Sequence, residues 1–263
     1  MAQSEVVKWS RRRALGAVAA LTGAALPGQT KAATAPRLPI RLVVLDIGGT
    51  IVEERGDIPE ALGAAFAKKG ISISRSEINQ WRGASKREIV RHFVTERLKR
   101  PGAERDKLIE TVYTDFQQRI IESYATIKGI PGAEDALRAM RNMGVTLATS
   151  TGFDATITAS IMSRLGWRDY FVAQITSDDV AQGRPSPYML FHAMEKARVD
   201  GVAQVVAVGD TPLDLRAAAN GGMAGIVGVL SGVGTRETME PEPHTDIIDS
   251  VATLPALLRS KYT

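Results

Sequence analysis

Leu42–Val52 reads LVVLDIGGTIV, a run of apolar residues that ends on Asp46 and continues at once into two glycines and a threonine. A strand over Leu42–Ile47 would be hydrophobic on both faces, which is typical of parallel strands covered by helices. In open sheets of this kind, functional groups collect at the carboxyl ends of the strands. The stretch therefore predicts an α/β fold and marks Asp46 as a candidate functional carboxylate.

Four further segments have a similar apolar character and are separated by helical patterns. They are Val145–Thr151, Val205–Val208, Ala224–Leu230 and the weaker Asp246–Val251. Strands that alternate with helices predict a doubly wound parallel sheet. At 263 residues with 44% apolar side chains, the chain is long enough for one such core and a small accessory domain.

Between the first two predicted strands, about ninety residues show helical spacing, far more than a simple crossover needs. Breaks at Gly70, Gly83 and Pro101-Gly102 separate four helical patterns, which are Pro59–Lys69, Arg75–Trp81, Lys86–Lys99 and Ala103–Ala125. A core helix over Gly132–Met143 then leads into the second strand. We expect a helical cap domain over residues 58–128 and a core domain made of residues 40–57 and 129–263.

The first 35 residues have the composition of an export leader. Ser10 and the arginines at 11–13 precede the small and apolar run Ala14–Leu26, and Ala33-Thr34-Ala35 offers a small-residue cleavage site. This segment resembles a bacterial twin-arginine signal peptide. It implies a periplasmic mature protein that begins at Pro36, or a cytoplasmic one if the leader does not function. The alternative is a disordered basic tail.

Charge and composition exclude several classes of function. The formal net charge of +4 comes from the first 35 residues, which hold five basic residues and one acidic residue. The remainder is balanced, so it gives no electrostatic reason to expect a nucleic acid partner. No apolar run reaches the roughly 18 residues of a membrane span, so we expect no membrane partner for the mature form. The absence of cysteine excludes disulfides, thiolate metal sites and a cysteine nucleophile.

Polar residues follow several of the predicted strands. Asp46 ends the first, Ser150 and Thr151 end the second, Arg184 lies in a Gly-Arg-Pro loop, and Asp210 and Asp214 lie in GDTPLD after Val205–Val208. Each piece alone also has a structural explanation, since an Asp after a strand is often a helix cap. Together, acids, a cation, a hydroxyl and glycine-exposed amides can hold Mg²⁺ and a phosphoryl group. Asp46 could then attack phosphorus.

The acid, hydroxyl, cation and acid pair, in this order, resemble the four motifs of the haloacid dehalogenase superfamily, whose hydrolases insert a helical cap into a Rossmann-like core. The resemblance covers about residues 40–255. It implies that Asp46 is the nucleophile and a Mg²⁺ ligand, and that the Gly48 carbonyl, Asp210 and Asp214 complete the metal site. It also implies a phosphate-binding set, namely Gly49, Thr50, Thr151 or Ser150, Gly152 and Arg184.

Position 48 departs from the common pattern of this superfamily. Its phosphatases usually place a second aspartate two residues after the nucleophile, where it protonates the leaving alcohol and later activates water. Gly48 can offer a carbonyl to a metal but cannot transfer a proton. Ordinary phosphomonoester hydrolysis should therefore be slower by about 10²- to 10⁴-fold unless another group substitutes.

One branch of the superfamily, the phosphonatases, lacks that acid. In this branch a cap lysine forms a Schiff base with phosphonoacetaldehyde, and the iminium accepts electrons as the C–P bond breaks. Three segments of the chain resemble the branch, namely Asp46–Thr50, Ser150–Phe153 and Asp178–Tyr188. Arg184 adds to the resemblance, because most of the superfamily uses lysine at that position.

The predicted cap contains a candidate for this lysine. The segment Trp81–Lys86 aligns with the branch and places Lys86 at the Schiff-base position. Such a lysine requires a lowered pKa, which Arg82 and Arg87 could provide. Arg82 and Ile89 nevertheless differ from the methionine and histidine that the branch carries in its aldehyde pocket. The alternative role of Lys86 is a surface charge, or a group that holds a distal anion of the substrate.

These residues favour a Mg²⁺-dependent, phosphonatase-like hydrolase. It would cleave a small phosphorylated or phosphonate substrate through phospho-Asp46, with Arg82 and Lys86 binding the substrate. Two alternatives stay open: a phosphomonoesterase or phosphotransferase without the usual second aspartate, and an exported protein that binds phosphate compounds without catalysis. We also expect a homodimer through the cap.

Overall fold

The computed structural model describes residues 39–98 and 102–262, which belong to one compact unit. The predicted leader, residues 1–35, lies outside the described residues, as does Pro101 of the predicted helix break. Export and cleavage therefore stay predictions from the sequence.

Six parallel strands form one sheet in the order β3-β2-β1-β4-β5-β6. The strands are β1 (Leu42–Leu45), β2 (Thr146–Ser150), β3 (Ala173–Ile175), β4 (Val205–Gly209), β5 (Gly225–Val229) and β6 (Asp246–Ile248). The chain adds β2 and β3 on one side of β1 and then crosses to β4 on the other side. The order thus reverses between β1 and β4, as it does in Rossmann-like sheets, and the predicted doubly wound α/β fold is confirmed.

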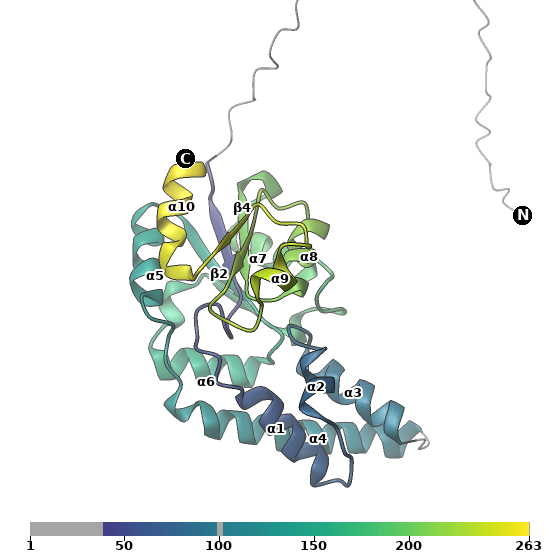
Figure 1. The fold of residues 1–263 in the computed structure, drawn as a ribbon. Helices are drawn as coiled ribbons and strands as arrows, with labels where there is room; N and C mark the ends of the chain where they lie inside the picture. The colour runs from purple at the N-terminus through teal and green to yellow at the C-terminus, as the bar shows by residue number, and fades with distance from the viewer. Residues whose placement is uncertain (1–38, 99–101, 263) are drawn as a thin grey trace, which may run out of the picture. The chain divides into compact units, whose positions relative to one another are not determined.

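Helices cover both faces of this sheet (Figure 1). One face carries α5 (Ala133–Asn142) and α10 (Leu254–Lys261), and the other carries α7 (Tyr188–Ala197) and α8 (Pro212–Asn220). Alternate side chains of β1 enter two separate cores: Val43 and Leu45 pack in one, and Leu42 and Val44 in the other. The uninterrupted apolar run of β1 is explained by this burial on both faces.

One more helix, a single helical turn and five 3₁₀ turns complete the described elements outside the four helices of the cap. They are α6 (Ala155–Leu165), α9 (Arg236–Met239) and the 3₁₀ turns η1 (Tyr124–Thr126), η2 (Arg168–Tyr170), η3 (Ser177–Asp179), η4 (Val202–Gln204) and η5 (Val251–Thr253). None of the helices in residues 39–98 and 102–262 has both the length and the apolarity needed to span a bilayer.

All five predicted strands are present, with ends that differ from the prediction by at most three residues. Strand β3 was not predicted. It has only three residues, it lies at the edge of the sheet, and only Ile175 among them is buried. No apolar run therefore marks it in the sequence.

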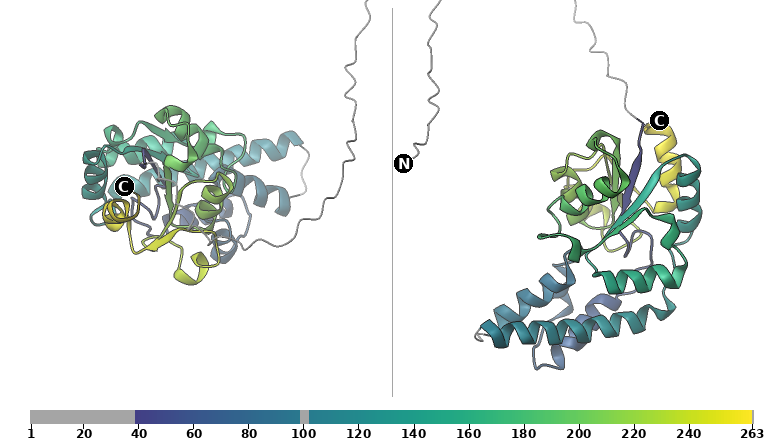
Figure 2. Two further views of the ribbon diagram at one scale, coloured as in Figure 1. Left: turned by 90° about the horizontal axis from the view of Figure 1, so that it is seen from above. Right: turned by 180° about the vertical axis from the view of Figure 1, so that it is seen from behind.

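Four helices follow β1 and lie beyond the carboxyl ends of the strands (Figures 1 and 2). We call them the cap helices: α1 (Asp57–Ala67), α2 (Arg75–Asn79), α3 (Lys86–Arg97) and α4 (Gly102–Ser123). Their ends lie within two residues of the predicted patterns. Phe66 of α1 and Phe93 of α3 pack edge to face, with ring centroids 5.9 Å apart. Because the cap helices and the sheet belong to one compact unit, their division into two domains stays a prediction.

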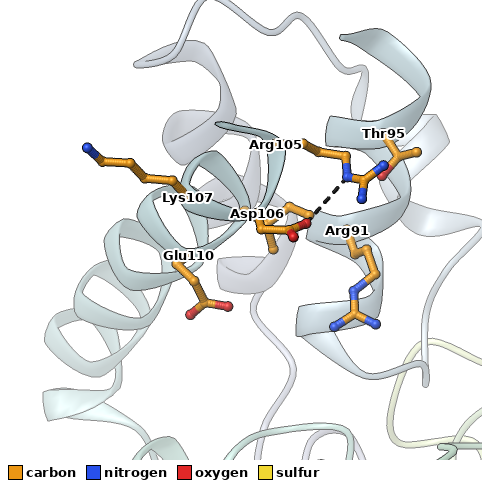
Figure 3. A pocket seen from close by; sticks show the side chains of 7 residues that line it. Arg91, Thr95, Arg105, Asp106, Lys107 and Glu110 are labelled. Carbon is orange, nitrogen blue, oxygen red and sulfur yellow. Dashed lines mark hydrogen bonds and ion pairs between the residues drawn. The ribbon is translucent and has the colours of Figure 1, made fainter. Parts of the chain in front are cut away.

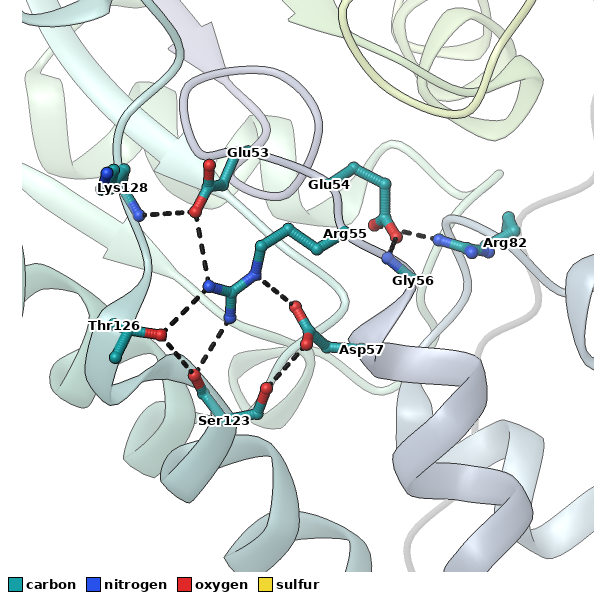
Figure 4. A network of polar contacts seen from close by, with 9 residues as sticks. All are labelled: Glu53, Glu54, Arg55, Gly56, Asp57, Arg82, Ser123, Thr126 and Lys128. Atoms are coloured by element: carbon teal, nitrogen blue, oxygen red, sulfur yellow. Dashed lines mark hydrogen bonds and ion pairs between the residues drawn. The ribbon is translucent and has the colours of Figure 1, made fainter.

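Arg55 ties together the two linkers that join the cap helices to the core (Figure 4). Its guanidinium donates to Asp57 Oδ2 at 2.9 Å, where α1 begins. It also donates to the Ser123 carbonyl at 3.0 Å, where α4 ends, and to Thr126 Oγ1 at 3.2 Å in η1. One side chain therefore holds both connections at a fixed separation.

A buried carboxylate attaches α4 to the core. Asp154 is 2% exposed and accepts hydrogen bonds from Tyr113 Oη and, at 2.7 Å, from Gln117 Nε2, both on α4. Its other oxygen accepts from the Ile157 N–H at 2.7 Å and caps α6. Asp154 directly follows Ser150–Phe153, so this predicted phosphate-binding segment is held against α4.

Replacement of Asp154 by alanine should lower the free energy of unfolding by about 2–4 kcal/mol, because α6 loses its N-cap and the buried Tyr113 hydroxyl loses its acceptor. Urea unfolding followed by circular dichroism measures the change. Asp169→Ala, at an exposed position, is the control and should leave the stability nearly unchanged. Equal unfolding midpoints for the two variants would contradict this role of Asp154.

Candidate active site

A cavity of about 30 Å³ lies where the carboxyl ends of the strands meet the cap helices. Its lining includes Asp46 and Gly48 after β1, Thr151 and Gly152 after β2, Arg184, Asp210 and Thr211 after β4, and Arg82 and Lys86 from the cap. Strands β1 and β4 are neighbours, and the Asp46 N–H donates to the Val208 carbonyl at 2.9 Å. The side chains of Asp46 and Asp210 therefore reach the same cavity, at the point where the strand order reverses.

Arg184 bridges the acidic groups at the base of this cavity. Its Nη2 donates to Asp46 Oδ1 at 2.8 Å, to the Ser150 carbonyl at 2.7 Å and to the Ser150 hydroxyl at 3.1 Å. Its Nη1 lies 2.8 Å from Asp214 Oδ1. All three charged side chains are buried, so the guanidinium is a fixed positive charge beside the candidate nucleophile.

Burial raises the pKa of two of the carboxyl groups that line the cavity, Asp46 and Asp210. Burial raises the pKa of Asp46 to about 6, while Arg184 opposes the shift and Asp214 adds to it. Burial and the nearby charges of Asp46 and Asp214 raise the pKa of Asp210 well above its ordinary value. In the described part of the chain Asp210 forms no ion pair, and the Val233 N–H donates to it at 2.8 Å. A cation between Asp46 and Asp210 would relieve this repulsion.

The Asp210 carboxylate lies against the backbone of two glycines. A Cβ atom at Gly49 or at Gly232 would overlap Asp210 Oδ2, and Gly49 also has a φ of 78°. The Gly49 N–H donates to the Val52 carbonyl at 2.7 Å, and Thr50 is fully buried. Neither Gly49 nor Thr50 lines the cavity. The structure thus gives Gly49 a steric role and does not bring the predicted phosphate-binding pair into the cavity.

The predicted metal ligands are placed in two groups. Asp46, Asp210 and Gly48 share the cavity, whereas Asp214 does not line it. One oxygen of Asp214 pairs with Arg184, and the other accepts from the Thr211 N–H at 3.0 Å and the Thr211 hydroxyl at 2.6 Å. Within residues 39–98 and 102–262, no three or more His, Cys, Asp or Glu side chains are arranged to hold a metal ion.

This arrangement still fits Mg²⁺. The ion usually keeps several waters and needs only one or two protein carboxylates together with substrate phosphate oxygens. Asp46, Asp210 and the backbone of Gly48 offer that number of oxygen donors in one cavity. The donor set therefore suits a hard divalent cation that is completed by water and substrate.

The hydroxyl that faces the cavity belongs to Thr151. Its Oγ1 accepts from the Phe153 N–H at 3.2 Å, which leaves the hydroxyl proton for another acceptor. Ser150 does not line the cavity, and its oxygens accept hydrogen bonds from Arg184. The sequence did not decide between the hydroxyls of Ser150 and Thr151, and Thr151 is the one in position to contact a phosphoryl group in the cavity.

The cap closes the cavity through backbone contacts. The Lys86 N–H donates to the Gly152 carbonyl at 3.1 Å. A Cβ at Gly152 would overlap the Ala84 carbonyl, and one at Gly83, where φ is 86°, would overlap Thr211 Oγ1. Glycines on both sides of the boundary thus allow the start of α3 to rest directly on the strand ends.

Lys86 presents a buried amine to the cavity. The residue is 6% exposed, and its Nζ lies 4.9 Å from the centroid of the Phe153 ring. Burial lowers the pKa of Lys86 to about 8, with Asp46 opposing the shift and Arg184 and Arg82 adding to it. An appreciable fraction of neutral amine is therefore present near neutral pH, as nucleophilic attack on a carbonyl requires.

Sequence reasoning missed Glu54, which lines the same cavity and forms an ion pair with Arg82 at 3.0 Å (Figure 4). It also missed the lining residues Ile58, Thr211 and Val233. Glu54 lies in an irregular linker beside another glutamate, so neither a motif nor a periodic pattern marks it.

Arg87 and Ile89, which the sequence associates with the lysine, do not line the cavity. Arg87 pairs with Glu110 at 2.5 Å and lies over the Tyr113 ring, 4.1 Å from its centroid. Ile89 is buried in the hydrophobic core that Val43 and Leu45 also enter. The prediction that Arg87 helps to lower the pKa of Lys86 is therefore wrong, because the side chain of Arg87 turns toward α4.

A larger hollow, of about 740 Å³, lies between α3 and α4 (Figure 3). Its lining mixes basic and acidic side chains, namely Arg91, Arg105, Asp106, Lys107 and Glu110, with Thr95 and Ile109. It contains none of the predicted site residues. Size alone would favour this hollow, but the convergent buried charges are in the smaller cavity.

Comparisons with known proteins show the family of this chain. The sequence model of the haloacid dehalogenase-like hydrolases matches residues 40–222. A phosphonoacetaldehyde hydrolase of Syntrophobacter fumaroxidans is 33% identical over 197 residues, which cover 70% of each chain. A phosphoglycolate phosphatase of Agrobacterium fabrum is 28% identical over 218 residues, which cover 82% of this chain and 91% of the relative.

Among solved structures, a phosphonoacetaldehyde hydrolase-like protein from Oleispira antarctica superposes with a TM-score of 0.75. The superposition covers 89% of this chain and 96% of that protein, at 18% sequence identity. At this identity the likeness supports the fold and carries no information on the substrate.

Replacement of Arg184 by methionine should lower the free energy of unfolding by about 3–5 kcal/mol at pH 7 in magnesium-free buffer, because Asp46 and Asp214 would be left buried without a cation. The loss should shrink at pH 5, since protonation of Asp46 removes part of the repulsion. Urea unfolding at both pH values measures the effect. Arg138→Met, which breaks the exposed pair with Glu134, should change the stability little. Equal losses in both variants would contradict the role of Arg184.

Proposed function

Since this chain belongs to the haloacid dehalogenase-like hydrolases, we propose that it is a phosphonatase-like member that uses Mg²⁺ and cleaves a small phosphonate through a phosphorylated Asp46. One observation carries the proposal. The buried amine of Lys86 lines the same small cavity as Asp46, while position 48 carries a glycine in place of a proton-transferring acid.

In the proposed reaction, the neutral amine of Lys86 condenses with the aldehyde of the substrate and releases water. Asp46 then attacks phosphorus, and the electron pair of the breaking C–P bond moves into the iminium to form an enamine. No leaving alcohol needs a proton, so Gly48 is no handicap. Water hydrolyses the phosphoaspartate, and protonation and hydrolysis of the enamine free the aldehyde product and Lys86.

Arg184 and Thr151 contribute by binding and orientation. The guanidinium lies 2.8 Å from Asp46 Oδ1 and can neutralise phosphoryl oxygens held against that carboxylate. The Thr151 hydroxyl can donate to one of these oxygens. Asp46, Asp210 and the Gly48 carbonyl would hold Mg²⁺, which supplies the positive charge that lets a phosphoryl dianion approach a carboxylate. Asp214 would act through Arg184, which it pairs with at 2.8 Å.

A phosphomonoesterase is the second candidate. It is favoured by the similarity to phosphoglycolate phosphatases, one of which covers 82% of this chain. Arg82 in the cavity and the buried Ile89 also differ from the methionine and histidine of the aldehyde pocket that the phosphonatase resemblance implies. In that case another group, or the substrate itself, must transfer the proton that Gly48 cannot.

Export to the periplasm and a homodimer through the cap are further proposals that rest on the sequence alone. The arginines at 11–13 with the apolar run after them support export. The proposed partner of the mature protein is a small-molecule substrate, and we propose no nucleic acid or membrane partner for it.

Borohydride reduction during turnover of phosphonoacetaldehyde should trap a covalent adduct on Lys86, located by peptide mass spectrometry. Phosphate release should stop when EDTA removes Mg²⁺ and in Asp46→Asn, although the latter should still form the adduct. Lys86→Arg should form none, because an arginine cannot make the imine. Phosphate release by the unaltered protein without any adduct at Lys86 would refute the imine mechanism and favour the phosphomonoesterase.

The rate should depend on pH through the amine. Because the pKa of Lys86 is lowered to about 8, kcat/KM for phosphonoacetaldehyde should rise roughly tenfold per pH unit below 8 and level off above it. Stopped assays of phosphate release from pH 6 to 9 measure this profile. A profile that is flat over this range would show that no group with the pKa of Lys86 controls the reaction.

A further inference from the structure

The ion pair between Glu54 and Arg82 lies at the boundary between the core linker and the cap (Figure 4). Arg82 Nη1 is 3.0 Å from Glu54 Oε2, and the other Glu54 oxygen accepts from the Gly56 N–H at 2.7 Å. The side chains are only 12% and 17% exposed for Glu54 and Arg82. Both residues line the candidate active-site cavity, so the pair would face a substrate bound there.

Arg82 also occupies the mouth of that cavity. It lines a second, outer groove of about 540 Å³, together with Thr211 and Val233, which line both hollows. Its Nε donates to Asn79 Oδ1 at 3.1 Å in the groove. With phosphorus beside Asp46, as the proposed function requires, a distal group of the substrate that extends toward this boundary would meet Arg82 and Glu54.

The charged residues of the lining balance one another. Three acids, Asp46, Glu54 and Asp210, face three bases, Arg82, Lys86 and Arg184. Arg184 is paired with Asp46, and Arg82 with Glu54. A divalent cation and a phosphoryl dianion that bind together add no net charge. A second anion on the substrate would find Arg82 already neutralised and the Glu54 carboxylate beside it.

We propose that Glu54 is a specificity-determining residue: by neutralising Arg82 at the cavity mouth, it makes the site prefer phosphonates or phosphates whose distal group is uncharged over those that carry a distal carboxylate. The inference rests on the proposed function, because it assumes that phosphorus binds beside Asp46. Substrates with a distal carboxylate would be excluded by repulsion from Glu54, and such repulsion contributes to specificity as much as attraction to the preferred substrate does.

Two ligands of nearly equal shape test the charge preference. Phosphonoacetate carries a distal carboxylate, and phosphonoacetamide replaces it by a neutral amide, so neither can form an imine. Isothermal titration calorimetry in the presence of Mg²⁺ gives the ratio of their dissociation constants. The unaltered protein should bind the amide more tightly. In Glu54→Gln the ratio should shift by roughly tenfold or more toward the carboxylate, because Arg82 becomes free to bind it.

Glu53→Gln is the matched control. Glu53 is the neighbouring residue and loses the same charge, but its carboxylate pairs with Arg55 at 3.5 Å and accepts from the Lys128 N–H at 3.1 Å, away from the cavity (Figure 4). The ratio of the two dissociation constants in Glu53→Gln should equal that of the unaltered protein. Arg82→Gln supplies an independent variant: the Glu54 charge is then unopposed, and preference for the amide should grow by roughly tenfold.

The outcomes separate the two proposals. An unchanged ratio in Glu54→Gln, or the same shift in Glu53→Gln, overturns the role of Glu54 and leaves the proposed hydrolase intact if phosphate is still released. Tighter binding of the carboxylate by the unaltered protein also overturns it. If neither ligand binds and no phosphate is released from any substrate, the proposed function fails and the inference fails with it.

Discussion

The contact between Arg184 and the two buried carboxylates Asp46 and Asp214 is the interaction on which the candidate site depends. Three charges are removed from water there, and each would be costly alone. The guanidinium compensates both acids and is itself fixed by Ser150, so the proposed nucleophile Asp46, the end of β2 and the helix α8 are held in one arrangement. Asp210 stands outside this network, without a cationic partner among the described residues, and is the group that a metal would complete.

Glycines let the cap approach the strand ends closely, so that Lys86 of the cap lines the cavity. Gly83 and Gly152 remove the side chains that would keep α3 away from the core, and Lys86 begins that helix. Its amine is therefore buried by the contact itself, and this burial is the main cause of its lowered pKa. The lowered pKa of the lysine is thus a property of the boundary between cap and core, and not of the cap alone.

The sequence predicts the fold and the positions of the central acids, because both depend on local patterns: apolar runs set the strands, and short polar motifs follow them. It predicts less well what depends on side-chain direction. Asp214 lies after β4 as expected, in the first turn of α8, but its carboxylate turns to Arg184 and Thr211, and Arg87 turns to Glu110. Strand β3 and Glu54 leave no signal, since an edge strand of three residues and a linker glutamate follow no period. Residues that act through a partner distant in sequence need the three-dimensional structure to be found.

The cavity has a volume of about 30 Å³, which is room for one or two water molecules. A phosphonate is larger, so under the proposed function the residues that line the cavity must move apart to admit it and close again around it. An imine made inside would then be shielded from bulk solvent until the C–P bond has broken. Premature hydrolysis, which returns the free aldehyde without any phosphoryl transfer, would be suppressed by the same packing that lowers the pKa of the amine.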